Sequence, residues 1–123
     1  MIVIYSFSYR DGGVPAEADA VFDVRSLPNP HGVPGLRRLD GRNPAVRTWL
    51  LTQSAHTARM LADAFAFTIR CRGESVAFGC HGGRHRSVAL AGMLSILLEQ
   101  IGVNSEVRHL ALGPITRGPD AQV

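Results

Sequence analysis

Lysine is absent from this chain of 123 residues, so all 13 basic residues are arginines. A phosphate-binding loop of the GxxxxGKS/T type requires a lysine, and the sequence therefore excludes that kind of nucleotide site. The arginines are scattered from Arg10 to Arg117 and form no run. This scatter favours a coding bias over a basic surface, so the net charge of +3 alone does not indicate a nucleic-acid partner.

Cysteine is also scarce, and this excludes a disulfide-rich or zinc-finger domain. Cys71 and Cys80 are the only cysteines, and they form no CxxC pair. The histidines do not have zinc-ligand spacing either; they lie at positions 31, 56, 81, 85 and 109. We therefore expect no metal and no cofactor.

Long apolar runs are missing too. None reaches the roughly 18 residues that a membrane-spanning helix needs. The first residues, MIVIYSFSYRDGG, lack the basic segment that opens a secretion signal. We expect a cytoplasmic protein, and a hydrophobic content of 46% in 123 residues predicts one compact domain.

What the chain does contain is an alternation of strand-like and helix-like segments. Strands are predicted at 2–7, 20–25, 76–78 and 104–112, and helices at 44–70, with a break near 52–54, and from about 87 to 101. A proline-rich loop covers 26–44. This order predicts a single layered α/β domain over residues 1–112, followed by a flexible tail at 113–123. Its small central sheet should have about four strands, be at least partly parallel and be flanked by helices.

Two regions of this fold are expected to meet at one edge of the sheet. Asp23 and Arg25 should project from the same face near the end of their strand. In parallel sheets, ligands bind at the carboxyl ends of the strands. The loop after Arg25 and the turn after Gly79 would both lie there.

The turn GCHGGRHRS, residues 79–87, has the composition of an anion-binding loop. Its glycines permit close approach of a ligand to the backbone, and the start of the next helix adds a partial positive charge. Arg86 is the best anchor because its planar fork matches two phosphate oxygens. Ser87 is expected as the N-cap or a first-turn residue, and His85 either donates to the anion or caps locally.

The same residues also allow a catalytic interpretation. Cys80 to Ser87 match C-x5-R-S and so resemble the phosphate loop of cysteine-dependent phosphatases. In those enzymes a cysteine thiolate attacks phosphorus, the arginine holds the oxygens and an acid protonates the leaving group. Here Cys80 would be the nucleophile and Arg86 the phosphate binder, with the acid supplied by Asp23, Asp40 or Asp11. Gly79 stands where that family usually has histidine, and Cys80 could equally be a small buried residue.

A longer resemblance favours binding over catalysis. The stretch ADAVFDVRSLPNPHGVPGLRRLDG, then AFGCHGGRHRSVALA, then SEVRHL, resembles the C-terminal domain of the RapZ family of RNase adapter proteins across residues 18–110. Family members also carry an N-terminal kinase-like domain with a Walker motif. We expect a stand-alone domain without that half and therefore without ATP binding.

The resemblance implies a non-catalytic sensor that binds a small phosphorylated metabolite, which is glucosamine 6-phosphate in the studied members. It also implies contact with structured RNA and self-association into a homodimer or larger homo-oligomer. By position, the pocket would use His31, His81, Gly82, Gly83 and Arg86, with Asp23 and Arg25 ordering the loops. Including the residues predicted from the turn itself, the candidate ligand-binding set is His31, His81, Gly82, Gly83, His85, Arg86 and Ser87.

Two departures from the family pattern affect specificity rather than the phosphate anchor. His81 stands where the family usually has threonine, and Arg84 where it has glutamine or lysine. After His109, Arg117 is the only basic residue, so RNA binding is a secondary expectation.

Overall fold

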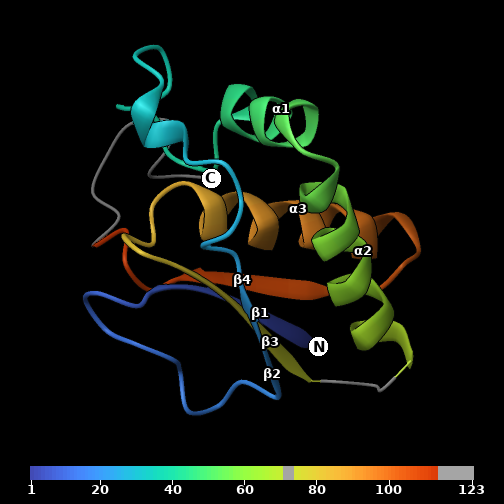
Figure 1. Ribbon diagram of the computed structural model, residues 1–123. Helices are drawn as coiled ribbons and strands as arrows, with labels where there is room; N and C mark the ends of the chain where they lie inside the picture. Colours follow the sequence, from blue (N-terminus) through green and yellow to red (C-terminus); the bar gives the residue numbers. More distant parts are fainter. Residues whose placement is uncertain (71–73, 114–123) are drawn as a thin grey trace.

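A computed structural model describes residues 1–70 and 74–113 (Figure 1). It confirms the α/β class, with four strands in one sheet of order β2-β3-β1-β4. All three strand pairings are parallel. In chain order the elements are β1 (Ile2–Ser8), β2 (Ala20–Asp23), the 3-10 helix η1 (Pro30–Gly32), α1 (Pro44–Gln53), α2 (Ala55–Arg70), β3 (Ser75–Cys80), α3 (Arg86–Gln100) and β4 (Ser105–His109).

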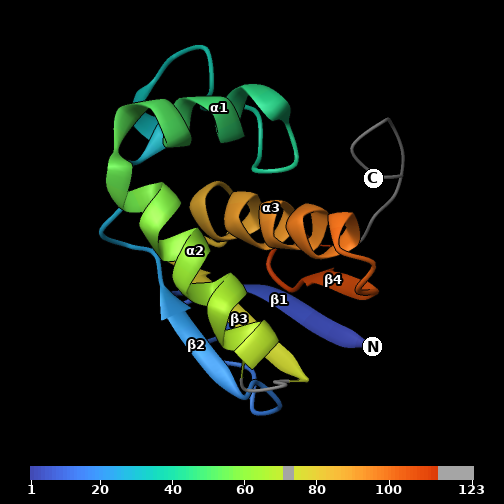
Figure 2. The ribbon, with the colours of Figure 1, turned by 90° about the vertical axis from the view of Figure 1, so that its right-hand side faces the viewer.

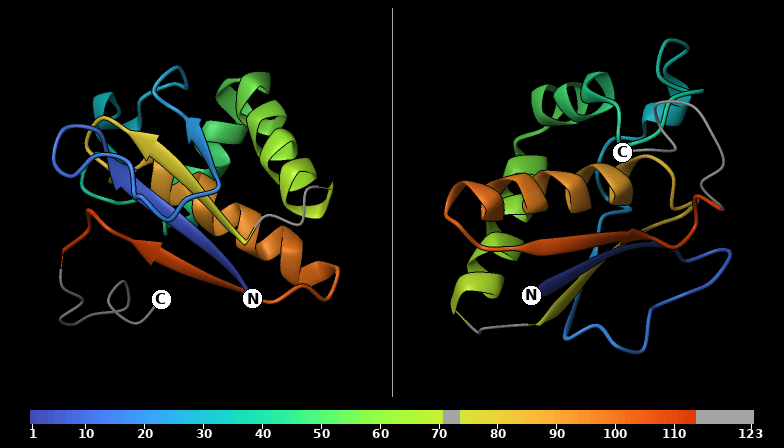
Figure 3. Two further views of the ribbon diagram at one scale, coloured as in Figure 1. Left: turned by 90° about the horizontal axis from the view of Figure 1, so that it is seen from below. Right: turned by 180° about the vertical axis from the view of Figure 1, so that it is seen from behind.

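The three α-helices lie on one face of the sheet rather than on both (Figure 2). Ile4, Val76 and Phe78 from the strands join Leu90 and Leu94 of α3 in the main core, and all five are fully buried. Because α3 is packed between the sheet and the other two helices, it is apolar on most of its surface. The opposite face of the sheet is covered by the segment between β1 and β2, which crosses in front of the strands in Figure 3, left.

Several predicted boundaries change. The predicted helix 44–70 is two helices, and the predicted break is confirmed at Ser54, whose backbone is extended. β3 runs on to Cys80 because it is buried along its whole length in the centre of the sheet. β2 stops at Asp23, so Arg25 lies beyond the strand. Residues 114–123, most of the predicted tail, lie outside the described part of the chain.

The register places the carboxyl ends of three strands at one edge. Ser8 of β1 pairs with Cys80 of β3, and Asp23 of β2 pairs with Gly79. The turn after Cys80, the loop after Asp23 and the segment after Ser8 therefore start side by side, as expected for the ligand edge of a parallel sheet. Within residues 1–70 and 74–113, none of the helices has the length and apolar character that crossing a membrane requires.

Candidate functional site

The predicted strand–turn–helix order is confirmed, with the turn at residues 81–85. Gly83 adopts φ +67°, and a Cβ there would lie 2.6 Å from Cβ of Ala111 and 3.0 Å from the amide nitrogen of Ser8. Both the conformation and the space therefore require glycine. α3 begins at Arg86, which makes Ser87 a first-turn residue; His85 occupies the N-cap position without a capping bond from its side chain.

The carbonyl groups of the turn accept hydrogen bonds from the rest of the domain, whereas its amide groups do not donate to the described part of the protein. The carbonyl oxygen of His81 accepts from the amide of Arg10 at 3.2 Å and from Oγ of Ser8 at 2.7 Å. The carbonyl oxygen of Arg84 accepts from the amide of Gly41 at 2.9 Å. Within the described residues, the N–H groups of 81–85 donate to no protein acceptor. A row of unpaired amides before a helix N-terminus is suited to an anion.

Arg86 uses half of its guanidinium to bind the protein. Its side chain comes from the first turn of α3, and the residue is only 7% exposed. Nη1 donates to the carbonyl oxygens of Arg25 at 2.7 Å and Leu27 at 3.2 Å, which joins the turn to the loop after β2. In the described part of the chain, Nε and Nη2 have no acceptor, and Nε is fully buried. This remaining pair is the side-on fork that can take two oxygens of one anion.

The turn and its neighbours enclose a cavity of about 300 Å³. Of the predicted binding residues, His31, His81, Gly82, His85 and Arg86 line it. Gly83 and Ser87 are buried and do not line it, and neither do Asp23 and Arg25. Cys80, the nucleophile of the catalytic alternative, also lines it. The remaining lining residues, which were absent from both predicted sets, are Arg10, Asn29 and Arg84.

The missed residues had only weak sequence signals. Arg84 is part of the turn motif, and Asn29 caps η1, because its Oδ1 accepts from the amide of His31 at 3.1 Å. Arg10 follows β1, and its position after a parallel strand was the only available signal.

Two of the histidines that line the cavity, His31 and His85, lie close together. The rings of His31 and His85 are 6.3 Å apart, edge to face. Nε2 of His85 donates to the carbonyl oxygen of Arg37 at 3.2 Å, and burial lowers the pKa of this imidazole below its ordinary value. His85 therefore offers a neutral ring, and it does not cap α3 locally. The lining arginines, Arg10, Arg84 and Arg86, supply permanent positive charge to the cavity.

Comparison with known proteins identifies the family. The RapZ C-terminal domain model matches residues 1–113. The chain belongs to the RapZ C-terminal domain family. Among its relatives, a nucleotide-binding protein of Frankia casuarinae is 42% identical over 120 residues, covering 89% of this chain and 40% of the relative. A nucleotide-binding protein of Stenotrophomonas maltophilia K279a is 46% identical over 110 residues, covering 82% and 37%. The chain thus spans about two fifths of the length of these relatives.

In this RapZ C-terminal domain, the carboxylates predicted as proton donors are all paired with arginine. Asp23 contacts Arg25 at 2.7 Å. Asp11 contacts Arg10 at 2.8 Å. In both cases the hydrogen bond from the arginine side chain is the main cause of a lowered pKa of the carboxyl group. Neither carboxylate lines the cavity.

Asp23 and Arg25 support the site through the backbone. Their side chains form an ion pair, although Arg25 lies beyond the end of β2, and the guanidinium of Arg25 stacks 3.9 Å from the ring centroid of Tyr9. Both side chains are about half exposed. The link to a lining residue is made by the carbonyl oxygen of Arg25, which accepts from Nη1 of Arg86. The predicted ordering role is therefore consistent with a backbone contact rather than with the two charges.

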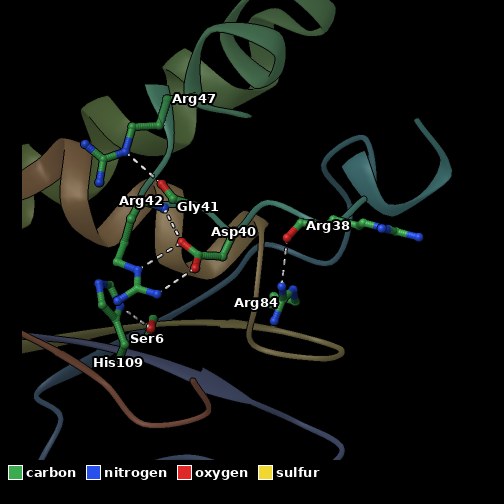
Figure 4. Close-up of polar contacts among 8 residues, drawn as sticks. All are labelled: Ser6, Arg38, Asp40, Gly41, Arg42, Arg47, Arg84 and His109. Carbon is green, nitrogen blue, oxygen red and sulfur yellow. Dashed lines mark hydrogen bonds and ion pairs between the residues drawn. The ribbon is translucent and has the colours of Figure 1, made fainter. Parts of the chain in front are cut away.

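A buried ion pair lies within a second loop of the RapZ C-terminal domain, and this loop contacts the turn through the amide of Gly41 and the carbonyl oxygen of Arg38 (Figure 4). Arg42 contacts Asp40 at 2.7 Å, and their side chains are 12% and 6% exposed. Burial alone would raise the pKa of Asp40, but the hydrogen bonds and charge of Arg42 outweigh it and lower the pKa. Nη2 of Arg84 donates to the carbonyl oxygen of Arg38, which belongs to the same loop as Asp40, at 3.0 Å. Asp40 is thus a structural carboxylate, and as an ionised group it is unsuited to the role of general acid.

Proposed function

We propose that this domain is a regulatory sensor that binds a small phosphorylated metabolite at residues 81–86. The observation that carries the proposal is the unpaired side-on fork of Arg86 at the wall of the cavity. A buried guanidinium with unsatisfied donors is unfavourable, and a phosphate group would supply the missing acceptors. The free amides of 81–85 lie next to it and would take further oxygens.

The size and the lining of the cavity favour a phosphomonoester of about monosaccharide size. A volume of about 300 Å³ is at the lower end for ligand pockets. The wall combines arginine with histidine and asparagine, which can bind sugar hydroxyl groups. An amino-sugar phosphate such as glucosamine 6-phosphate, as the family resemblance implies, fits this chemistry. The relatives' name, nucleotide-binding protein, makes a mononucleotide the natural comparison ligand.

Calorimetric titration with glucosamine 6-phosphate, glucose 6-phosphate and AMP tests this function. The parent chain should bind a phosphorylated ligand, and Arg86→Lys should weaken binding by at least about tenfold, because lysine has no side-on fork. Gly82→Ala should also weaken binding while leaving the melting temperature unchanged. A Cβ at Gly82 has only Nη2 of Arg10 nearby, at 3.8 Å, so it fits the fold but projects where the anion would lie.

Gly35→Ala is the matched control, since a Cβ there meets nothing within 4 Å and Gly35 is not a lining residue of the cavity. It should bind like the parent chain. If the parent binds none of the three phosphates, or if Gly82→Ala binds as tightly as Gly35→Ala, the proposal is wrong.

A second candidate function is cysteine-dependent phosphatase activity, favoured by one contact. Sγ of Cys80 donates to Oγ of Ser87 at 3.2 Å, and Cys80 lies on the cavity wall. The cysteine sulfur would attack phosphorus and release an alcohol, and water would then cleave the sulfur–phosphorus bond to give inorganic phosphate. The alcohol needs a proton, and each nearby carboxylate is paired with arginine. Sensing is therefore better supported.

Release of p-nitrophenol from its phosphate ester separates the two functions. A phosphatase would show turnover that Cys80→Ser abolishes, because a serine hydroxyl is a far weaker nucleophile. We expect the parent chain to be inert in this assay while still binding phosphate.

The resemblance also predicts self-association and contact with structured RNA, and both belong to the proposal. Arg117 is the only basic residue in the sequence of the predicted tail, and it lies outside the described residues.

A further inference from the structure

We propose that Arg10 is a second phosphate-binding arginine, which Asp11 holds at the rim of the cavity until a dianion displaces the carboxylate. The inference rests on the proposed function and adds a selection step to it. Arg10 lines the cavity, but its guanidinium is currently bound to Asp11, through Nη2 at 2.8 Å and Nε at 3.0 Å, both to Oδ2.

The position of Arg10 relative to the turn supports this role. Apart from Gly82 itself and its two chain neighbours, Nη2 of Arg10 is the only heavy atom among the described residues within 4 Å of the place where a Cβ of Gly82 would be. The guanidinium therefore stands over the open side of Gly82, next to the unpaired amides of the turn. Arg86 faces the same cavity from α3, so an anion between the two would be held by arginines from different elements.

The backbone of this segment is fixed, so only a side chain has to turn. The amide of Arg10 donates to the carbonyl oxygen of His81, and the amide of Asp11 donates to Oγ of Ser8 at 3.0 Å. Oγ of Ser8 in turn donates to the carbonyl oxygen of His81 at 2.7 Å. The backbone of Arg10 and Asp11 is thus hydrogen-bonded, directly or through Ser8, to the proposed anion-binding turn.

The ion pair is weak enough to be exchanged. The side chains of Arg10 and Asp11 are 58% and 53% exposed, and an ion pair in such a setting contributes little to stability. A hydrogen bond to a dianion in a partly enclosed cavity is stronger. Asp11 therefore sets a threshold: a phosphomonoester dianion exceeds it, and a weakly charged anion such as chloride does not.

A double-mutant cycle with inorganic phosphate as the probe tests the inference. Arg10→Ala should weaken binding about fivefold, for the loss of one charge-assisted bond. Asp11→Asn should strengthen binding about threefold, because Arg10 no longer has to leave a carboxylate. In the double variant, Asp11→Asn should bring no gain, since there is no arginine to release.

Glu106→Gln is the matched control, because Glu106 forms a similarly exposed pair with Arg108 on β4, and it should leave phosphate binding unchanged. Equal binding by Arg10→Ala and the parent overturns the inference and leaves the proposed function intact. The same gain from Asp11→Asn with and without Arg10 also overturns it, because Asp11 would then act only by repulsion. A parent chain that binds no phosphate overturns both.

Discussion

Gly41→Ala is expected to destabilise the domain by about 3 kcal/mol, at the upper end for overpacking, and to weaken phosphate binding. A Cβ on Gly41 would collide with the amide nitrogen of Ala89 and the carbonyl oxygen of His85 and would lie 2.8 Å from the carbonyl carbon of Val88. All of these are backbone atoms at the start of α3, so no side-chain rotation can relieve the contact. The first turn of α3 has to move, and it carries Arg86.

Urea denaturation followed by circular dichroism measures this loss, and Gly92→Ala is the control. The three atoms nearest to a Cβ on Gly92 would all belong to the guanidinium end of the Arg47 side chain, which can shift by rotation, whereas the atoms at Gly41 belong to the backbone. Alanine also favours the helix over glycine by about 1 kcal/mol. The free energy of unfolding of Gly92→Ala should therefore lie within about 1 kcal/mol of the parental value. Equal stabilities for the two variants would contradict the tight contact at Gly41.

Acidification from pH 7 to pH 5 is expected to reduce the free energy of unfolding by about 2 kcal/mol through His109. Burial first, and then the positive charge of Arg42, lower the pKa of this imidazole from 6.5 to about 4. The unfolded chain therefore binds the proton more tightly than the folded domain does. The contribution of neutral His109 to the free energy of unfolding is present above pH 6.5. It is lost as the pH drops toward 4, where His109 of the folded domain also becomes protonated.

The surroundings of His109 explain why the neutral ring is required. Nδ1 shares a hydrogen bond of 2.6 Å with Oγ of Ser6, which is fully buried. Arg42 and Arg47 oppose a positive charge on the ring, and Asp40 favours it only partly (Figure 4). Burial lowers the pKa of His85 too, so His85 adds to the acid sensitivity in the same direction.

Urea denaturation at several pH values between 7.5 and 4.5 checks this prediction. His109→Gln, which keeps a polar group but cannot become charged, should have a shallower dependence on pH than the parent. His56→Gln, at an exposed position on α2, should keep the parental dependence. A parent chain with constant stability across this range would contradict the assignment.

The element types and the glycine-containing turn between β3 and α3 were predictable because they depend on neighbours in the sequence. Alternating β-branched and aromatic residues identified β1, and helical spacing of apolar residues identified α3. The glycines of the turn and the arginine that follows likewise sit in one short stretch, so the strand–turn–helix arrangement did not require knowledge of the fold. Strand ends were less well predicted, since burial by adjacent strands extends β3 to Cys80.

The composition of the cavity wall was beyond such local patterns, because it depends on contacts between distant segments. Arg10 reaches the cavity only because β1 lies beside β3, and Asn29 only because the loop after β2 is bound by Arg86. The same long-range contacts use half of the Arg86 guanidinium. The arginines that pair with Asp11, Asp23 and Asp40, by contrast, lie only one or two positions away in the sequence. Which donors remain free for a ligand is thus a consequence of packing, since a polar group is available only where the folded chain has not already satisfied it.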